Sequence, residues 1–405
     1  MRIGILTFHR SVNNGAVMQC YALSKRLRED FPEDSVEVID YHMPKVEKGY
    51  SASLSHYFQG SSPSLVVKRA YHLLRNPRLL SNLKMRNSVF NESVIKLPLS
   101  SVSIFEDGEE GVFEYINNNY DVLIVGSDAV WNYVTRGFPN AYFPDERVKC
   151  IKLSYAASCY GMEFLKIPED QRDRIGQILD SFNFIGVRDS ATEDFIKWSG
   201  CSKSSVHTCD PTVLLDVDDL PIDKDRLKRK LISRGFDFDR LSIGVMGTEK
   251  MVSMIRKLYG RQYQIVALYN YTKGADVQLF DIEPYEWAYV FRLFKITFTT
   301  YFHGTLLSLR NGVPVICIAL DTEFSKNHIP KTLDVLKRLG YEDWYFNTDY
   351  ISKGVNAIKE KADYLIREDK SEEIRDRLDI EADSYRQLQL VVNRIRSTWG
   401  GIVNT

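Results

Sequence analysis

The chain has 405 residues, 44% of them hydrophobic, so it holds ample material for the cores of two or three domains. Its 53 lysines and arginines nearly balance 54 acidic residues, which argues against a nucleic-acid partner and leaves any anion site to local structure. No C-x-x-C pair and no apolar stretch near the ~18 residues of a membrane helix occur, and the N-terminal apolar run is too short for a signal peptide. We therefore expect a protein of the reducing cytoplasm.

Short β-branched runs alternate with helical patterns along the chain, which predicts parallel sheets with crossover helices. The predicted strands are Ile3–Phe8, Val36–Ile39, Asp121–Val125, Cys150–Tyr155, Phe184–Val187, Leu241–Met246, Gln264–Leu268, Ile296–Thr300 and Pro314–Ile318. The predicted helices include Ala16–Leu27, one that starts with a capping box at Ser190, and Thr305–Asn311, which Gly312 ends.

A charged segment with few strand signals, residues 216–240, is taken as the boundary between two Rossmann-like domains that face each other across a cleft. The first domain spans 1–220, with a basic insertion at about 50–115, and the second spans 240–370. Residues 371–405 are expected to form a polar helix that packs back on the first domain. The turn Asp210–Pro211–Thr212 is interpreted as setting the domain connection.

The segment Ser64–Phe90 contains six basic residues, no acidic one, and many interleaved apolar residues. Such a segment can bind an anionic membrane surface or a lipid-linked diphosphate, which would make the protein peripheral at the inner face of the cytoplasmic membrane. The commoner interpretation is a solvated helix that pairs with acidic residues elsewhere. The basic residues are Lys68, Arg69, Arg75, Arg78, Lys84 and Arg86.

Polar residues follow several predicted strands, at the carboxyl ends where doubly wound sheets bind their ligands. After the first strand, His9, Asn14 and Gly15 lead into a helix, in a turn that either offers backbone N–H groups to an anion or is an ordinary capped turn. After Asp121–Val125, Asp128 is either a general base for a hydroxyl group or a helix N-cap.

Two further strand ends carry groups suited to anions. Arg188 follows Phe184–Val187, and its fork can clamp a carboxylate or phosphate, unless it forms a structural salt bridge. His303 precedes Gly304 at a helix N-terminus, where a histidine can bind an anion and transfer a proton near neutral pH, although a lone histidine is more often packed or exposed. No pair of His, Cys or carboxylate residues has metal-ligand spacing, so no metal is expected.

Seven short motifs, taken in order, resemble those of the polysaccharide pyruvyltransferase family over roughly residues 1–335. They are Gly4–His9, Asn14–Gln19, Val125–Asn132, Ser154–Ser158, Val187–Asp189, Asp210–Thr212 and Phe302–Gly304. The resemblance implies a fold similar to the two-domain GT-B glycosyltransferases and phosphoenolpyruvate as a co-substrate, with no resident cofactor. It also implies a sugar acceptor, such as galactose or an N-acetylhexosamine of a surface polysaccharide or its lipid-linked precursor. The product would be a cyclic pyruvate ketal, with release of phosphate.

The resemblance also assigns roles to residues. Family members bind the donor through arginine and histidine residues, which match Arg188 and His303 here, but many carry a further arginine where this chain has Tyr301. Lys326 or Arg10 is the expected substitute for that cation, and Ala129 stands where a glutamine is common. The expected catalytic residues are His303 and Asp128, the expected donor-binding residues are Arg188, His303, Gly304, Thr305 and Lys326, and the expected acceptor or cleft residues are His9, Asn14, Gly15, Ser127, Trp131 and Tyr301.

Two other functions remain open at this point. The main alternative is a nucleotide-sugar glycosyltransferase of the same architecture, in which Asp40, just after the second strand, would contact a ribose. The third is a non-catalytic glycan-binding or scaffold role, which the many aromatic residues would support by stacking on sugars.

Overall fold

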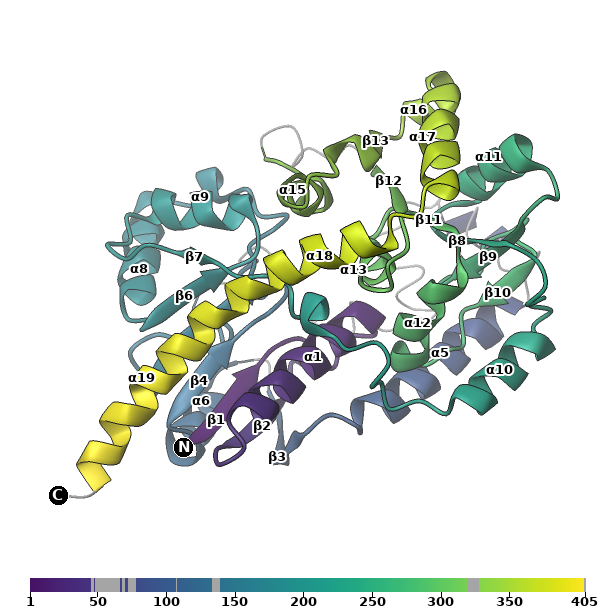
Figure 1. Cartoon of the computed structure of the whole chain (residues 1–405). Helices are drawn as coiled ribbons and strands as arrows, with labels where there is room; N and C mark the ends of the chain where they lie inside the picture. The colour runs from purple at the N-terminus through teal and green to yellow at the C-terminus, as the bar shows by residue number, and fades with distance from the viewer. Residues whose placement is uncertain are drawn as a thin grey trace.

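Two parallel sheets, formed by successive parts of the chain, organise the protein (Figure 1). The computed structural model describes residues 1–44, 47, 66–67, 70–71, 78–106, 108–132, 139–319 and 328–403. The first sheet has seven strands in the order β3-β2-β1-β4-β5-β6-β7, and the second has six in the order β10-β9-β8-β11-β12-β13. Counted within each sheet, both contain the 3-2-1-4-5-6 order of a Rossmann fold. The sequence prediction of two parallel α/β domains is therefore confirmed.

The first sheet is built from the N-terminal half of the chain. Its strands are β1 (Arg2–Leu6), β2 (Ser35–His42), β3 (Leu99–Phe105), β4 (Val122–Val125), β5 (Ile151–Ala157), β6 (Phe184–Val187) and β7 (Val206–His207). The helices of this half are α1 (Asn14–Asp30), α5 (Arg78–Val94), α6 (Glu110–Asn119), α8 (Glu169–Asp180) and α9 (Ser190–Ser199).

The second sheet follows a helix, α10 (Lys224–Ser233), that lies within the predicted boundary segment. Its strands are β8 (Ser242–Met246), β9 (Gln264–Leu268), β10 (Val277–Leu279), β11 (Ile296–Thr299), β12 (Val315–Ala319) and β13 (Tyr345–Asn347). The helices of this part are α11 (Glu249–Tyr259), α12 (Pro284–Val290), α13 (Phe302–Arg310), α15 (Lys331–Arg338), α16 (Tyr350–Lys353) and α17 (Val355–Arg367).

Each predicted strand overlaps an observed one, because the central strands are buried on both faces and therefore appear as continuous apolar runs. In β4, alternate residues divide between two apolar clusters: Val122 and Ile124 belong to one, and Leu123 and Val125 to the other. The four strands that the sequence did not reveal, β3, β7, β10 and β13, are all at sheet edges. β3 is largely exposed, so its sequence needs no apolar run.

Two helix starts differ from the prediction. Helix α9 begins at Ser190, but its N-cap is the preceding residue, Asp189, whose side chain accepts a hydrogen bond from the Thr192 N–H at 3.0 Å. Helix α13 begins at Phe302, three residues before the predicted start at Thr305, so His303 lies within its first turn rather than before it.

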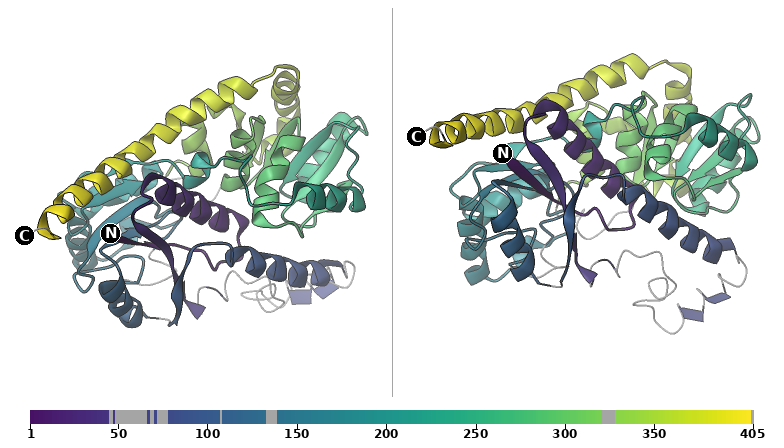
Figure 2. Two further views of the ribbon diagram at one scale, coloured as in Figure 1. Left: turned by 60° about the horizontal axis from the view of Figure 1, so that its bottom comes forward. Right: turned by 90° about the horizontal axis from the view of Figure 1, so that it is seen from below.

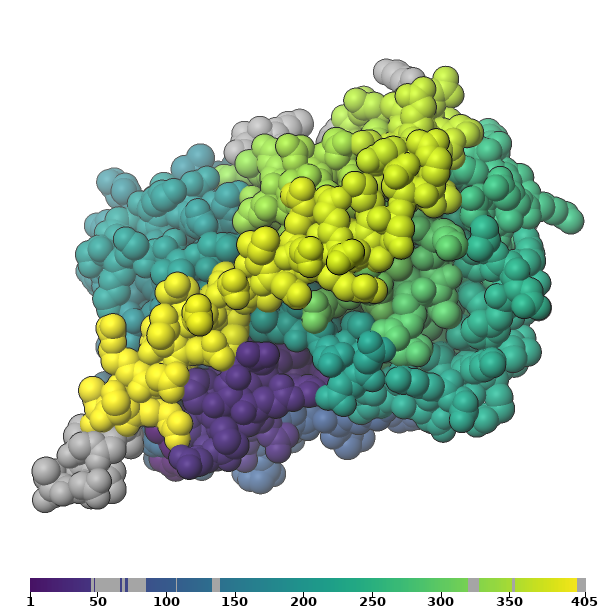
Figure 3. All heavy atoms as spheres, viewed as in Figure 1, coloured from purple at the N-terminus to yellow at the C-terminus, as the bar shows by residue number. Residues whose placement is uncertain are grey.

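The last two helices, α18 (Ser371–Ala382) and α19 (Arg386–Val403), run back from the second sheet along the first part of the chain (Figures 1 and 2). The space-filling view shows them lying across the face shared by both halves (Figure 3). Gln389 donates to Asp30 at 2.8 Å, and Arg396 pairs with Glu33 at 2.8 Å, so α19 is fastened to the end of α1 and the turn after it. No helix among the described residues is long and apolar enough to cross a membrane.

Helix α5 also bridges the two halves. Lys96, just after α5, pairs with Glu283 at 2.5 Å, and the Tyr285 hydroxyl of α12 donates to the Ser93 carbonyl at 3.2 Å. The N-terminal half therefore contacts the second part of the chain through α5 and α1, both of which pack on α12. These contacts bring the carboxyl ends of the two sheets together.

Candidate active site

The N-termini of α1 and α13 meet at the point where the strand order of each sheet reverses, which is where doubly wound sheets bind ligands. Gly15, in the first turn of α1, lies against the imidazole of His303, in the first turn of α13. A Cβ at Gly15 would lie 2.0 Å from Nδ1 of His303, so this approach requires a glycine. The two halves of the chain thus share one site.

A network of charged side chains occupies this site. Arg188, just after β6, donates through Nη2 to Asp128 at 3.0 Å and through Nη1 to Asp210 at 2.8 Å. Asp210 also lies 3.7 Å from Nε2 of His303, and Asp189 lies 4.0 Å from Nε of Arg188. The guanidinium of Arg188 stands 5.0 Å from the ring centroid of Phe302. Arg188 and His303 therefore meet through Asp210.

Burial and charge set the protonation of this network. Arg188 is only 2% exposed. Burial acts to raise the pKa of Asp128, but Arg188, His303 and Lys331 outweigh it and hold that pKa below its ordinary value. The pKa of Asp210 is likewise lowered, because the neighbouring His303 and Arg188 outweigh burial. The three carboxyl neighbours raise the pKa of Arg188 against its own desolvation. Asp128, Asp210 and Arg188 are therefore charged near neutral pH.

Lys331, the first residue of α15, contributes a second cation beside Arg188. Its ammonium lies 5.2 Å from the ring centroid of Phe302 and 5.1 Å from that of Tyr160. Burial lowers its pKa, and the neighbouring Arg188 lowers it further. Within the described residues, no carboxylate oxygen forms an ion pair with this ammonium. Lys331 thus presents a partly buried charge that an anion would stabilise.

Four buried polar atoms around this site have no hydrogen-bond partner among the described residues: Nε of Arg188, Oδ2 of Asp189, Nε2 of His303 and Nε1 of Trp287. Buried polar groups in folded proteins are nearly always bonded, and leaving one unbonded costs roughly 1–3 kcal/mol. Three of these four atoms are donors or, in histidine, potential donors. Their concentration here indicates a site that is completed by a ligand with acceptor groups.

A cavity of about 130 Å³ opens beside these groups. Its lining residues are Asn13, Asp128, Met246, Tyr269, Trp287, Tyr301, Phe302, His303 and Lys331. Two of them have a left-handed backbone that is unusual outside glycine, Asp128 with φ 84° and Tyr269 with φ 74°. Such conformations concentrate at functional sites, where the surrounding structure holds them.

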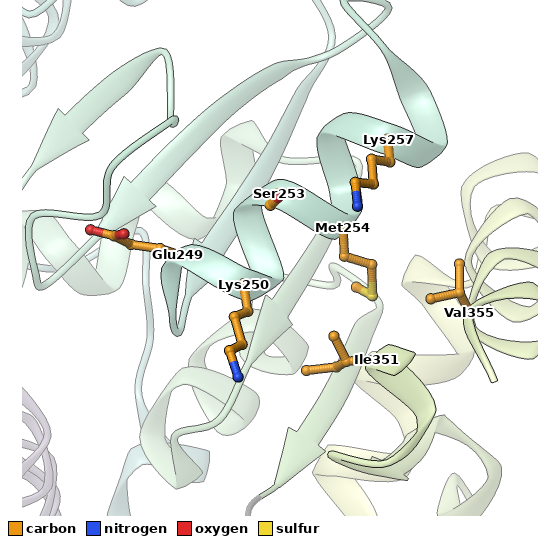
Figure 4. Close-up of a pocket in the computed structure, with 7 residues that line it drawn as sticks. All are labelled: Glu249, Lys250, Ser253, Met254, Lys257, Ile351 and Val355. Atoms are coloured by element: carbon orange, nitrogen blue, oxygen red, sulfur yellow. The ribbon is translucent and has the colours of Figure 1, made fainter. Parts of the chain in front are cut away.

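A larger cavity, of about 540 Å³, lies between α11 and the helices α16 and α17 (Figure 4). Its charged side chains, Glu249, Lys250 and Lys257, do not converge on one point. None of the predicted site residues lines it. The chemistry of the molecule therefore favours the smaller cavity as the active site.

Several predicted acceptor residues are committed to the structure instead of the cavity. His9 is fully buried, and its Nε2 bonds Asp40 at 2.9 Å. Ser127 is buried and donates to the Gln19 side chain. Trp131 is 2% exposed, and its Nε1 donates to the Tyr142 carbonyl at 3.0 Å within an aromatic core. These side chains have no surface to offer a sugar, so the expectation that they line the cleft is corrected.

The remaining predicted residues lie closer to the cavity. Asn14 and Gly15 form the first turn of α1. Gly304 is closely packed, since a Cβ there would lie 2.7 Å from Oγ1 of Thr299. The Thr305 hydroxyl donates to the Tyr301 carbonyl at 3.2 Å within α13, so it supports the helix turn. Tyr301 precedes α13 at the N-cap position and lines the cavity.

Many family members are expected to carry an arginine at the position of Tyr301, and the structure places neither of its two expected substitutes, Arg10 and Lys326, in the site. Arg10 is held by Asp40 through two bonds, of 2.8 Å and 2.7 Å, and Lys326 lies outside the described residues. Lys331 is the cation that the structure brings to the cavity. Sequence reasoning missed it, although a lysine at the first position of a helix, directly after Pro330, is placed against the helix dipole and is a weak signal. Asp210 was also missed as a site residue, because its turn was assigned only to the domain connection.

The two-domain fold has counterparts among solved structures, which share it at low sequence identity. A UDP-N-acetylglucosamine 2-epimerase is 12% identical, with 98% of this chain and 96% of that chain covered and a TM-score of 0.50. The UDP-GlcNAc 2-epimerase from Neisseria meningitidis is 10% identical, with 96% of this chain and 100% of that chain covered and a TM-score of 0.49. The heptosyltransferase WaaC of E. coli is 12% identical, with 90% of this chain and 100% of that chain covered and a TM-score of 0.37. At 12% identity, the likeness to the first of these structures shows a shared fold alone.

The sequence, in contrast to the fold, identifies the family to which the chain belongs. The family model described as polysaccharide pyruvyl transferase matches residues 13–322, which is more than half of the chain and includes Asp128, Arg188, Asp210 and His303. The chain therefore belongs to the polysaccharide pyruvyl transferase family. Among curated proteins, none matches its sequence.

Proposed function

We propose that this protein transfers the pyruvyl group of phosphoenolpyruvate to two hydroxyl groups of one sugar, forming a cyclic ketal and releasing phosphate. The observation that carries the proposal is the convergence of His303 and Lys331 on a small cavity whose lining Asp128 is bonded by Arg188, together with buried donors that lack partners among the described residues. Phosphoenolpyruvate carries a carboxylate and a phosphate, and arginine forks, desolvated lysines and helix N-termini are suited to such groups. Family membership supports the same reaction class.

The size of the cavity supports a small donor. A volume of about 130 Å³ is well below the roughly 300–1,000 Å³ of pockets that enclose drug-sized ligands. A compact, highly charged donor such as phosphoenolpyruvate suits this space better than a nucleotide-sugar does. Asp40, which a nucleotide-sugar enzyme would use for a ribose, is already bonded by His9, Arg10 and Ser103. Both observations weigh against the glycosyltransferase alternative.

The reaction needs a proton donor for carbon and a proton acceptor for the sugar hydroxyls. Protonation of the methylene carbon of phosphoenolpyruvate leaves a cationic centre at the next carbon, which the first hydroxyl oxygen attacks as it loses its proton. The second hydroxyl then attacks the same carbon, the bond from that carbon to the phosphate oxygen breaks, and the second proton leaves with phosphate. Of the two hydroxyl protons, one therefore replaces the proton that was added to the methylene carbon, and the other leaves on the phosphate.

The described residues suit these roles. His303 lines the cavity, and its Nε2 lies 3.7 Å from Asp210 with no hydrogen-bond partner among the described residues, so His303 is assigned the proton transfer to carbon or the binding of phosphate. Asp128, ionised and paired with Arg188, is assigned the role of base. An anionic donor that binds Arg188 would weaken its hold on Asp128 and so raise the basicity of that carboxylate. General acid–base catalysis of this kind is worth about 10²–10⁴-fold in rate.

The test is incubation with phosphoenolpyruvate and a panel of galactosides and N-acetylhexosaminides, free and lipid-linked, followed by phosphate assay and mass spectrometry of the sugars. We expect phosphate release that requires both substrates and survives a metal chelator, and an acceptor that gains one pyruvate less one water. Release of a nucleotide from a nucleotide-sugar, with no reaction of phosphoenolpyruvate, would contradict the proposal. Activity that a chelator abolishes and a divalent ion restores would contradict its metal-free form.

A further inference from the structure

The acceptor sugar has to bind at the rim of the cavity. A volume of about 130 Å³ is well below the roughly 300–1,000 Å³ of pockets that enclose drug-sized ligands, so we do not expect the cavity to enclose the donor and a pyranose ring together. The acceptor must nevertheless reach the atoms next to His303 and Asp128. A residue that binds the acceptor must therefore line the cavity and also extend to the surface.

Tyr301 has both properties. It lines the cavity, two residues before His303, and is 37% exposed, more than any other large hydrophobic residue of the lining. Its ring meets that of Tyr269 at an interplanar angle of 62°, with centroids 5.7 Å apart. Its hydroxyl accepts a hydrogen bond from Nδ2 of Asn270 at 3.2 Å, so the ring is held in place from the second sheet.

Arg86 of α5 supports this aromatic pair from the first part of the chain. Its guanidinium lies 3.6 Å from the ring centroid of Tyr269. It donates through Nη1 to Asn270 at 3.1 Å and through Nη2 to the Val12 carbonyl at 3.3 Å. One arginine therefore holds Tyr269 directly and Tyr301 through Asn270, and it ties both to the loop that precedes α1. Such a rigid arrangement is what a stacking surface requires.

Trp287 adds a polar group to the same wall. It lines the cavity, its ring lies 6.3 Å from that of Tyr269, and its buried Nε1 has no acceptor among the described residues. A sugar can use both kinds of group. Its C–H groups pack on aromatic rings, and its hydroxyl groups accept hydrogen bonds from an N–H donor. Binding of an anionic donor alone would not require an exposed aromatic surface.

We propose that Tyr301 is the platform on which the ring of the acceptor sugar stacks, with Arg86 as the positioning residue that holds the platform. This inference rests on the function proposed above and names the place of its second substrate. The occupant is a pyranose ring that presents an apolar face to the tyrosine and two hydroxyls toward Asp128 and His303.

The experiment compares Tyr301→Ala with Tyr301→Phe, using p-nitrophenyl β-galactoside and p-nitrophenyl N-acetyl-β-glucosaminide as acceptors at saturating phosphoenolpyruvate. We expect Tyr301→Ala to raise the acceptor KM by about tenfold, a change that corresponds to roughly 1.4 kcal/mol, and to leave the Kd for phosphoenolpyruvate unchanged by calorimetry. Tyr301→Phe keeps the ring but loses its bond to Asn270, so it should raise the acceptor KM less than Tyr301→Ala does. The Tyr301 side chain does not cap α13, so its removal should not unfold that helix.

Arg86→Ala should raise the acceptor KM as well, with the Kd for phosphoenolpyruvate again unchanged, because the donor groups lie elsewhere in the site. An unchanged acceptor KM in Tyr301→Ala, or an equal loss of phosphoenolpyruvate affinity, would overturn the inference and leave the proposed function standing. If the unaltered protein releases phosphate with neither glycoside nor any other sugar of the panel, the proposed function fails and this inference fails with it.

Discussion

Arg188 offers a quantitative test of how the site is held together. Its two ion pairs, of 3.0 Å to Asp128 and 2.8 Å to Asp210, join side chains that are 1%, 13% and 2% exposed. A unit charge pair at about 4 Å is worth roughly 4 kcal/mol at an effective dielectric of 20, before desolvation is subtracted. Removing one partner of a buried pair typically costs about 3–5 kcal/mol, because the other charge stays buried. We expect Arg188→Ala to lower the free energy of unfolding by this amount.

The stability lost in Arg188→Ala should depend on pH, and the pKa shifts of the two carboxyl groups give the direction of that dependence. The pKa of both carboxyl groups lies below the ordinary value in the folded protein, so their stabilising contribution is fully present above about pH 4 and is lost as the pH falls through the folded pKa. Without Arg188, one of the groups that oppose burial is gone, so the pKa of each carboxyl group is higher than in the unaltered protein and protonation in acid relieves more of the penalty. The loss caused by Arg188→Ala should therefore be smaller at about pH 5 than at pH 7.

Urea unfolding at the two pH values measures both effects. The matched control is Arg174→Ala, which removes an arginine whose side chain is 38% exposed and pairs with the exposed Glu146 at 2.7 Å. We expect that control to cost at most about 1 kcal/mol. A cost for Arg188→Ala no larger than the control, or one that does not shrink in acid, would refute the reasoning. Arg188→Lys should also impair donor binding, because one ammonium cannot replace the fork.

Three further predictions concern the site and the basic segment. Gly15→Ala places a methyl group 2.0 Å from the His303 imidazole and should abolish most activity without unfolding α1, whereas Gly108→Ala, with no atom within 4 Å of the new Cβ, should leave turnover unchanged. Equal turnover in the two variants would contradict this. His303→Ala should lower kcat by about 10²–10⁴-fold if the imidazole transfers a proton, and should weaken phosphoenolpyruvate binding more than kcat if it only holds phosphate; near-normal turnover would remove it from the site. Neutralising Lys68, Arg69, Arg75 and Arg78 should slow turnover of a lipid-linked acceptor at low salt and spare a soluble one, and unchanged turnover of both would favour the solvated-helix interpretation. The side chains of these four residues lie outside the described part of the structure.

The sequence predicted the central strands because parallel strands buried on both faces are mostly apolar, as Val122–Val125 is throughout and Gln264–Leu268 is after its first residue. It also predicted that residues after strands β6 and β11 would meet, since the carboxyl ends of facing Rossmann-like sheets converge. The edge strands were missed because β7 has two residues and β3 is mostly exposed, so neither carries a distinctive pattern.

The site itself was predicted only in part. His303 and Arg188 follow strands whose ends could be located, so their approach was foreseeable. The burial of Trp131 and His9 was not, because which face of a loop points inward depends on packing between distant segments, such as Trp131 against Phe182. Lys331 lies beyond the motifs and reaches the cavity only because α15 is placed against Phe302 and Tyr160.

The most direct test of the central claim, that the site between the two sheets binds phosphoenolpyruvate, is a calorimetric titration of the full chain. We predict that phosphoenolpyruvate binds the unaltered protein and that Lys331→Met, which keeps the length of the side chain and removes its charge, weakens binding about tenfold or more. Lys359→Met, which removes a lysine that is 42% exposed and paired with Asp363, should leave the Kd unchanged. No heat of binding with the unaltered protein, or an equal Kd in Lys331→Met, would contradict the claim.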